Sequence, residues 1–445
     1  MVFREAIERD ALDLQALARR AAAETGDDPL DGALHRDLAA LGNDYLAQER
    51  HLEKAALTLR QAWLSAAHRP ADATLKSPGE GQRANVPCGD SLQFGYERDL
   101  DVSILEDRGA TYARPPAGWT SDMVIFRSGQ AALATILQFV ATTWGDRRTL
   151  STAHAGAYFE TRALLGAWPR RSFRLVPASA VSADVVIAEP VWCNGCFGVT
   201  EHLPRARHVL LLDTTMVGPA YDLGPCLGAA GDECDVAIAF SSGLKLDQAG
   251  LELANVGIAR LLVRDRAPRR TAEIAGRLRQ LRGLMATGLT LAELSALSAP
   301  WFLDRAYADG YVAAIFANNR ALAQSIGRDS PVFAPQCHPV LSTSAADAPF
   351  CAIQLREPSP AHYRRLVEII EQQCDRRGLL LTKGGSFGFR GHRFELIEPM
   401  PRQGDPFVRI AMGWRDGHSC RGLGELLGEL AIYKSFAALD RAYGR

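Results

Sequence analysis

The sequence predicts an α/β protein with a large, mostly parallel sheet covered by helices on both faces, followed by a smaller α+β domain. From about residue 120, short apolar runs such as MVIF, VLLL and VAIAF alternate with stretches of helical periodicity. Strands that are buried on both faces read as continuous apolar runs, and their alternation with helices is typical of a parallel sheet. After about residue 328 the pattern becomes strand, helix and strand, which indicates the smaller domain.

The remaining segments have patterns of their own. Residues 1–68 place apolar side chains at three- and four-residue spacing, which predicts helices. Residues 69–95 are rich in Pro, Gly and Asp, so we expect a loop or arm there. Helical periodicity returns at about 271–328 and in a last helix at about 421–443. We therefore expect three parts, an N-terminal helical segment and arm, a large domain and a small C-terminal domain, at residues 1–115, 116–320 and 321–445.

Composition narrows the classes of partner. The chain carries 50 basic and 51 acidic residues, a formal net charge of -1, which gives no electrostatic reason to expect nucleic acid or an anionic membrane as a partner. The first twenty residues are charged throughout, and the apolar runs fall short of the ~20 residues that a spanning helix needs. We expect a cytoplasmic protein, of bacterial origin by its composition, that acts on a small molecule.

The nine cysteines are odd in number and scattered, which argues against a disulfide framework. The segment CNGC, Cys193 to Cys196, has the spacing of a redox or zinc pair. A zinc site would need a second pair of ligands at motif spacing, and the sequence has no other CxxC and no HxxxH. We expect two thiols in a turn, and no metal site.

Chemistry is expected where the strands of the large sheet end, because open α/β sheets bind ligands outside the carboxyl ends of their strands. Ser128, Gly129 and Gln130 follow MVIF and open a helix, whose free N–H groups can bind a phosphate, although Ser-Gly is also a common cap. Asp213 follows VLLL, where a carboxylate is costly unless it is paired or serves as a turn residue. Lys245 follows VAIAF in the stretch SSGLK.

Lysine is rare in this chain, which gives Lys245 added weight. Only five of the 50 basic residues are lysines, so most surface cations are arginines. Burial lowers the pKa of a lysine and makes its neutral amine a nucleophile toward a carbonyl, and arginine cannot form a Schiff base. A phosphate-binding helix start, a strand-end Asp and a post-strand Lys, in this order, describe a site for pyridoxal 5'-phosphate (PLP): the phosphate needs N–H groups, the pyridine nitrogen an anion and the aldehyde an amine.

With these residues the chain resembles the fold-type I PLP enzymes, and among them a divergent member of the cystathionine gamma-synthase and gamma-lyase family of Cys/Met metabolism. The resemblance covers roughly residues 96–415. It implies a seven-stranded, mostly parallel sheet in the large domain and PLP as cofactor. It also implies that Ser128 to Gln130 form the phosphate loop, that Asp213 in LDTT contacts the pyridine nitrogen, and that Lys245 carries the cofactor.

Further motifs extend the resemblance on the cofactor side. YFET offers Tyr158 in the place of the family's ring-stacking tyrosine, and we expect it to be catalytic together with Lys245. EPVWCNG offers Asn194 for the ring hydroxyl, with one residue more than the family's spacing. SGLK matches the family's S-x-T-K and gives Ser242 as a phosphate ligand. Leu244 stands where the family has Thr, so one phosphate hydroxyl is lost.

The resemblance also names residues for the substrate. FVRIAMG offers Arg409 for the substrate's α-carboxylate, where a guanidinium can form a bidentate pair. TKGGSFGF resembles the family's SLGG turn, with Ser386 and Thr382 as alternative carboxylate ligands, and it contains Lys383, a rival Schiff-base lysine. The family grips the phosphate with a Y-x-R from a neighbouring subunit. The matches here are Tyr96 with Arg98, and as a competitor Tyr112 with Arg114.

Such a shared site would make the protein a homo-oligomer, a dimer or tetramer. The resemblance favours elimination or replacement at the β or γ carbon of an amino acid, and the departures from the family pattern favour an unusual amino acid of specialised metabolism. An aminotransferase or another reaction at the α carbon is the alternative on the same scaffold. A PLP-binding protein without catalysis is the third possibility.

Overall fold

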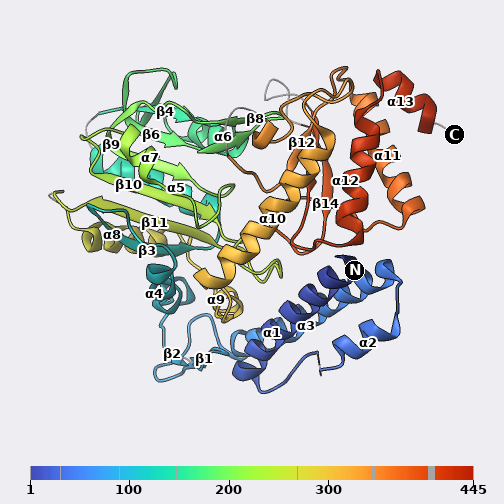
Figure 1. Ribbon diagram of the computed structural model, residues 1–445. Coiled ribbons are helices and arrows are strands. Elements are labelled where there is room, and N and C mark those ends of the chain that lie inside the picture. Colours follow the sequence, from blue (N-terminus) through green and yellow to red (C-terminus); the bar gives the residue numbers. More distant parts are fainter. Residues whose placement is uncertain are drawn as a thin grey trace.

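The computed structural model describes residues 2–30, 32–89, 91–145, 148–267, 269–341, 346–398 and 406–443. It contains a large and a small sheet with their helices, and a layer of N-terminal helices along one side (Figure 1). Among the described residues, none of the helices combines the length and the apolar character needed to cross a membrane.

The large sheet has seven strands among the described residues, in the order β3-β11-β10-β9-β6-β4-β5. Strand β11 is antiparallel to both of its neighbours, and the other pairs are parallel, so the predicted mostly parallel, seven-stranded sheet is confirmed. The strands are β3 (Trp119–Phe126), β4 (Leu150–Ala155), β5 (Phe173–Val176), β6 (Ser182–Ala188), β9 (Arg205–Asp213), β10 (Val236–Ser242) and β11 (Gly257–Arg264).

Both faces of this sheet are buried. Helices α5 (Gly129–Trp144) and α8 (Thr271–Leu284) pack on one face with Val209 and Leu211, and α7 (Gly224–Ala229) packs on the other with Leu210 and Leu212. All four of these β9 side chains are 0% exposed. Burial on both faces explains why the central strands are continuous apolar runs in the sequence.

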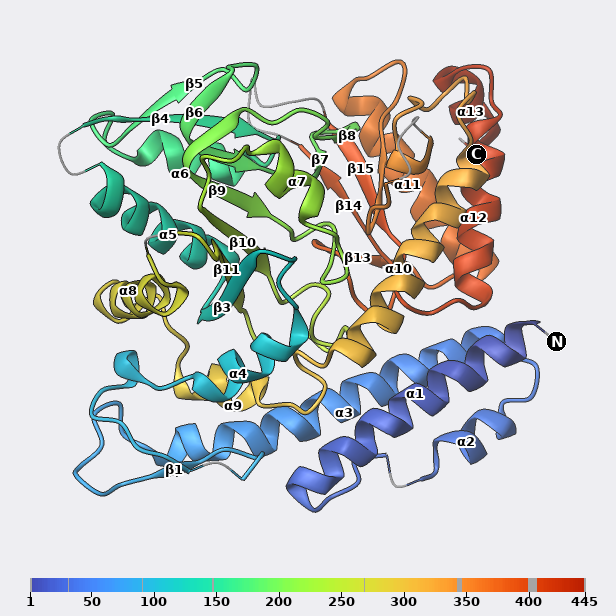
Figure 2. The same ribbon diagram turned by 60° about the vertical axis from the view of Figure 1, so that its left-hand side comes forward.

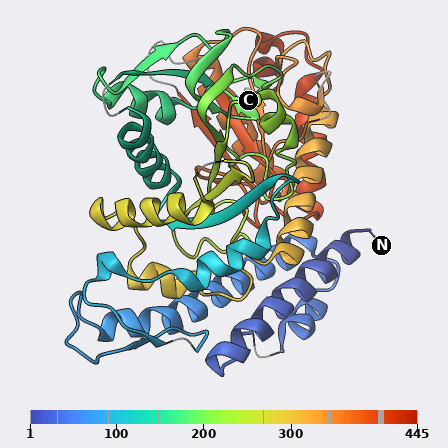
Figure 3. The same cartoon turned by 90° about the vertical axis from the view of Figure 1, so that its left-hand side faces the viewer.

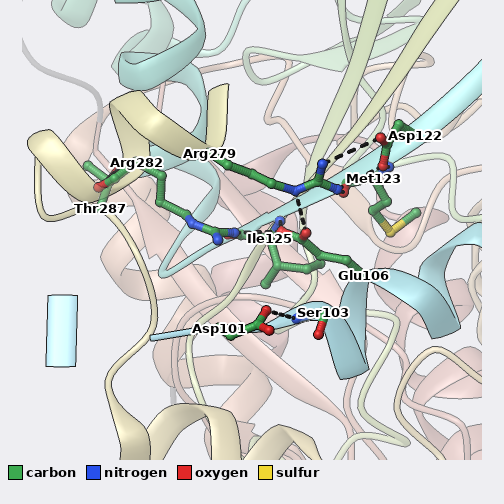
Figure 4. Close-up of polar contacts among 9 residues, drawn as sticks. All are labelled: Asp101, Ser103, Glu106, Asp122, Met123, Ile125, Arg279, Arg282 and Thr287. Atoms are coloured by element: carbon green, nitrogen blue, oxygen red, sulfur yellow. Dashed lines mark hydrogen bonds and ion pairs between the residues drawn. The ribbon is translucent and has the colours of Figure 1, made fainter. Parts of the chain in front are cut away.

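The outer edge of β3 is closed by charged side chains instead of another strand. Glu106, on α4 (Ser103–Tyr112), accepts a hydrogen bond from the backbone N–H of Ile125 (3.1 Å), and Arg282 donates to the Ile125 carbonyl (2.9 Å) (Figure 4). Arg279 binds the other carboxylate oxygen of Glu106 (2.6 Å). An open strand edge leaves polar groups unpaired, so these contacts hold in place the strand that leads into Ser128.

In the part of the small domain that the structure describes, four strands form a sheet in the order β12-β15-β14-β13, covered by helices on one side. Its strands β12, β14 and β15 form antiparallel pairs, and β13 joins β14 in parallel. The predicted last helix is interrupted after Ala431 and resumes at Phe436. The elements are β12 (Cys351–Ile353), β13 (Thr382–Lys383), β14 (Arg393–Ile397), β15 (Phe407–Ala411), α10 (Arg305–Ile326), η2 (Pro339–Leu341), α11 (Pro360–Arg377), α12 (His418–Ala431) and α13 (Phe436–Tyr443).

The N-terminal segment forms the helices α1 (Val2–Thr25), α2 (Leu34–Ala40) and α3 (Tyr45–Ala73). Helix α3 continues through Pro70, so the expected loop at 69–95 begins later than the sequence indicated. The loop itself contains a short hairpin of β1 (Ala84–Asn85) and β2 (Ser91–Leu92), then the 3-10 turn η1 (Glu97–Asp99).

The N-terminal helices pack against their own chain, as the blue layer in Figures 2 and 3 shows. Trp63 of α3 is 1% exposed, packs on Trp301 and donates to the carbonyl of Ala296 (2.7 Å), at the end of α9 (Leu291–Leu297). Leu14 of α1 belongs to the same core. The predicted domain limits stay a prediction, since this core joins N-terminal helices to elements of the large domain.

Candidate active site

A cavity of about 650 Å³ opens at the carboxyl ends of β9 and β10. The large domain forms one wall and the strands β14 and β15 form the other. Most of the site residues predicted from the sequence line this one cavity. They are Ser128, Gly129, Gln130, Tyr158, Asn194, Asp213, Ser242, Lys245, Ser386 and Arg409.

The predicted phosphate loop begins helix α5. Ser128 is the N-cap, with an extended backbone, and its Oγ accepts a hydrogen bond from the N–H of Ala131 (3.1 Å). The loop lies against β10 and β11: a β-carbon on Gly129 would lie 3.4 Å from Ser242, and one on Gly257 would lie 2.1 Å from the Ser128 carbonyl. A helix start of this kind presents backbone N–H groups to the cavity and suits an anion.

Asp213 and Lys245 lie at the ends of neighbouring strands. Burial raises the pKa of the Asp213 carboxyl, and the nearby Glu189 adds to this, whereas a hydrogen bond from the Thr215 N–H (3.0 Å) opposes it. Burial lowers the pKa of the Lys245 amine, and the neighbouring Arg409 acts in the same direction, while Asp213 opposes the shift. A lysine with a lowered pKa holds a larger neutral fraction and is a better nucleophile and base.

Tyr158 precedes helix α6 (Phe159–Ala167) and contributes its side chain to the same cavity. Its hydroxyl donates a hydrogen bond to Glu160 (2.7 Å). Burial raises the pKa of Tyr158, and the Glu160 carboxylate raises it further, so the phenol keeps its proton at neutral pH.

Glu189 is a site residue that the sequence reasoning missed. It follows β6 directly, is 5% exposed and lines the cavity. Its carboxylate accepts hydrogen bonds from the N–H of Tyr158 (2.9 Å) and Ala157 (3.2 Å), and it pairs with His154 (3.1 Å). The same strand-end rule that selects Asp213 would have selected Glu189.

Asn194 lies in the turn between the short strands β7 (Val191–Cys193) and β8 (Phe197–Val199). The N–H of Asn194 donates to the carbonyl of Cys196 (3.2 Å), and Gly195 has a φ of 107°. The CNGC segment is therefore a hairpin turn, as expected. It brings Cys193 and Asn194 to the cavity.

Arg409, the predicted carboxylate ligand, already has an anionic partner in this chain. It lies on β15 directly opposite Glu395 of β14, and the two side chains form a close ion pair within the cavity lining. Its Nε is shielded from solvent and makes no hydrogen bond to any described residue. Glu395 has no local sequence signal, because its pairing with Arg409 depends on the register of β14 against β15.

The segment before β14 contributes Ser386 and Phe387. Ser386 has a φ of 72°, an unusual value for a residue with a side chain, and its shielded hydroxyl has no hydrogen-bond partner among the described residues. The ring of Phe387 lies 4.7 Å from Lys245 Nζ and 5.9 Å from Arg409 Cζ, measured from its centroid. The alternatives Thr382 and Lys383 are exposed on β13 and do not line the cavity.

Tyr96 and Arg98 do not reach the cavity of their own chain. Arg98 Cζ lies 5.2 Å from the Tyr96 ring centroid, and the tyrosine is 57% exposed. In the competing pair, Tyr112 is buried and donates its hydroxyl to Asp247, so it is engaged within its own chain. A phosphate contact from Tyr96 or Arg98 would require a second subunit, and this stays a prediction.

Solved structures of known proteins share this architecture. No family profile matches the chain, and no curated protein matches it. Solved structures do: a methionine gamma lyase from Micromonospora echinospora is 18% identical over 83% of this chain and 98% of its own, with a TM-score of 0.51. A cystathionine gamma-lyase from Lactobacillus plantarum in complex with L-serine is 14% identical over 84% and 99%, with a TM-score of 0.53.

A third match is a cystathionine gamma synthase from Xanthomonas oryzae pv. oryzae in complex with aminoacrylate and cysteine. It is 14% identical over 84% of this chain and 99% of its own, with a TM-score of 0.51. At these identities the likeness establishes the fold, which is that of the fold-type I PLP enzymes. The resemblance predicted from the motifs is thereby confirmed at the level of architecture.

Proposed function

We propose that the protein is a PLP-dependent enzyme that eliminates or replaces a group at the β or γ carbon of an amino acid. The observation that carries the proposal is the presence of a helix start, a carboxylate and an amine in one cavity, at Ser128, Asp213 and Lys245. The architecture that the chain shares with methionine and cystathionine gamma-lyases supports the choice of reaction.

The residues present fit the proposed cofactor. The start of α5, with the hydroxyls of Ser128 and Ser242, offers donors for a phosphate. Asp213 is a carboxylate whose surroundings raise its pKa, and a protonated pyridine nitrogen would supply a cationic partner for it. When bound, PLP supplies an electron sink that stabilises negative charge at the substrate's α carbon.

The side chains of this chain then have distinct tasks. Lys245, in its neutral form, would hold the cofactor through its amine and would take and return the proton at the substrate's α carbon. Asp213 would keep a proton on the pyridine nitrogen through its negative charge. Tyr158 offers its ring to stack on the cofactor and its phenol, which is hydrogen-bonded to Glu160, as a catalytic group. Arg409 orients the substrate's carboxylate.

The ion pair between Glu395 and Arg409 affects how a substrate can bind to Arg409. A substrate carboxylate must displace Glu395 before it can form a bidentate contact with Arg409. Together with Leu244 in place of a phosphate hydroxyl, this feature supports our further proposal of an unusual amino acid of specialised metabolism. We also propose a cytoplasmic homo-oligomer, in which Tyr96 and Arg98 of the partner subunit approach Ser128.

The test is to mix the PLP-loaded protein with a panel of amino acids and to follow the cofactor's absorption and the products. Release of ammonia with a keto acid or an unsaturated product is expected. Formation of pyridoxamine phosphate with a keto acid would instead establish an aminotransferase. An absorption spectrum that no amino acid changes would overturn the proposal of catalysis and leave a binding protein.

A further inference from the structure

The loop that follows Lys245 has a backbone that needs support. Ala249 and Glu252 have φ values of 54° and 49°, in the left-handed region that residues with side chains rarely adopt. The wholly buried Gln248 braces the loop from inside: its Nε2 donates to the carbonyl of Gly243 (3.0 Å) and its Oε1 accepts from the N–H of Leu253 (2.7 Å). Strain of this kind persists only where surrounding contacts fix the conformation.

A second segment, residues 386–390, packs directly against this loop. A β-carbon on Gly388 would lie 2.2 Å from the carbonyl oxygen of Lys245, and one on Gly250 would lie 2.6 Å from the backbone nitrogen of Arg390. The two backbones are therefore in direct contact at both points. Because Ser386 and Phe387 begin the second segment and line the cavity, the position of one segment constrains the other.

The N-terminal helices hold both segments. Arg60 of α3 donates from Nε (3.2 Å) and Nη2 (3.0 Å) to the carbonyl of Glu252, one of the strained residues. Asp10 of α1, which is 0% exposed, binds Arg390 in a close ion pair and Arg415 at 2.7 Å. Thus α3 fixes the loop after Lys245, and α1 fixes the segment that packs on it.

We propose that α1 and α3 act as a clamp that positions Lys245 in the cavity, with Arg60 and Asp10 as positioning residues. The proposal rests on the proposed function only for the role given to Lys245. Arg60 acts through the carbonyl of Glu252 on the loop that carries the lysine. Asp10 acts through Arg390, whose segment packs Gly388 against the Lys245 backbone.

The experiment measures Lys245 in the cofactor-free protein. The rate at which an amine-reactive acylating reagent labels Lys245 is followed by peptide mass spectrometry as a function of pH, which gives the midpoint of its titration. The charged groups that face the amine are Asp213, Arg409 and Glu160. We expect Arg60→Ala to free the loop, to hydrate the amine and to raise the midpoint by up to about one pH unit, with faster labelling at the plateau.

Three further variants make the test specific. Arg50→Ala removes an exposed arginine from the same helix and should leave the midpoint and the melting temperature unchanged. Arg60→Lys, which retains a donor and the charge but loses the planar fork, should restore part of the wild-type midpoint. Asp10→Asn should shift the midpoint in the same direction if the protein folds. A lower melting temperature in Arg60→Ala with an unchanged midpoint would overturn the clamp.

This readout separates the clamp from the proposed function. Adding PLP to the wild-type protein should protect Lys245 from labelling, because the amine is then bound. If PLP gave no protection, the proposed function would fail. The effect of Arg60→Ala on the cofactor-free lysine would still decide the clamp.

Discussion

The two walls of the cavity differ in how they satisfy their charges. The wall of the large domain, named the cofactor wall after its proposed ligand, is formed by Ser128, Asp213, Ser242 and Lys245. It has a carboxylate and an amine whose pKa values burial moves toward the neutral forms. Such groups gain from a ligand that brings the opposite charge or a reactive carbonyl. This wall is prepared for a partner that the chain itself does not provide.

The wall of the small domain, named the substrate wall after its proposed ligand, is formed by Ser386, Phe387, Glu395 and Arg409. It contains both members of an ion pair. Glu395 already neutralises Arg409, so a ligand gains there only the difference between its own contact and the one it replaces. One wall of the cavity therefore attracts a ligand through its incompletely paired charges. The other wall is selective, because a ligand must compete there with Glu395 for Arg409.

The largest effect is expected from removing the amine of the cofactor wall. Lys245→Ala should abolish covalent attachment of PLP and its visible absorption band, because no other amine lies in the described cavity lining. Lys383→Ala is the matched control: its side chain is exposed and paired with Glu371 (3.1 Å), so its removal should leave the band intact. A band that survives in Lys245→Ala and disappears in Lys383→Ala would reverse the assignment.

The next effect is expected at the carboxylate of the same wall. Asp213→Asn keeps the size of the side chain but cannot hold a proton on the pyridine nitrogen, so kcat should fall by roughly two orders of magnitude or more. PLP binding, followed by absorption, should weaken less than kcat. Asp232→Asn, at a position whose side chain is 91% exposed, serves as the control and should retain wild-type kcat. Equal kcat values in both variants would mean that Asp213 does not tune the cofactor.

A smaller effect, of opposite sign, is expected at the substrate wall. Glu395→Gln removes the competitor for Arg409, so KM for an amino-acid substrate should fall by about three- to tenfold, the equivalent of one modest ionic hydrogen bond. Glu398→Gln removes the same charge from an exposed position of the same lining and should change KM little. A higher KM in Glu395→Gln would show that Glu395 binds the substrate instead of competing with it.

The difference between the walls also explains what could be predicted from the sequence. Asp213 and Lys245 follow apolar runs that mark buried strands, and the strand-end rule places both at one edge of the sheet. Strand β4 escaped notice because its sequence, LSTAHA, is polar: Ser151 is satisfied by Asp184 and His154 by Glu189. Local patterns cannot reveal such partners.

Contacts between residues far apart in the chain could not be predicted from the sequence for the same reason. The pairing of Glu395 with Arg409 requires the register of β14 against β15. The pairing of Asp10 with Arg390 joins residues that are 380 positions apart. Neither has a local sequence signal, so the helices of residues 1–68 could be predicted while their contact with the active-site segments could not.

An effect on stability, with no change in activity, is expected behind the large-domain wall, at Asp247, which accepts a close hydrogen bond from Tyr112. Burial raises the pKa of Asp247 from 3.8 to about 6, although the Tyr112 contact opposes the shift. Folding therefore favours the protonated carboxyl over the ionised one, relative to the unfolded chain. The contribution of Asp247 to stability is fully present below its pKa in the unfolded chain and is lost as pH rises through its pKa in the folded protein. Asp247→Asn should therefore raise the free energy of unfolding by roughly 1–3 kcal/mol at about pH 8 and change it little at about pH 4, as measured by urea unfolding. Destabilisation at the higher pH would mean that the ionised carboxylate is needed to hold Tyr112.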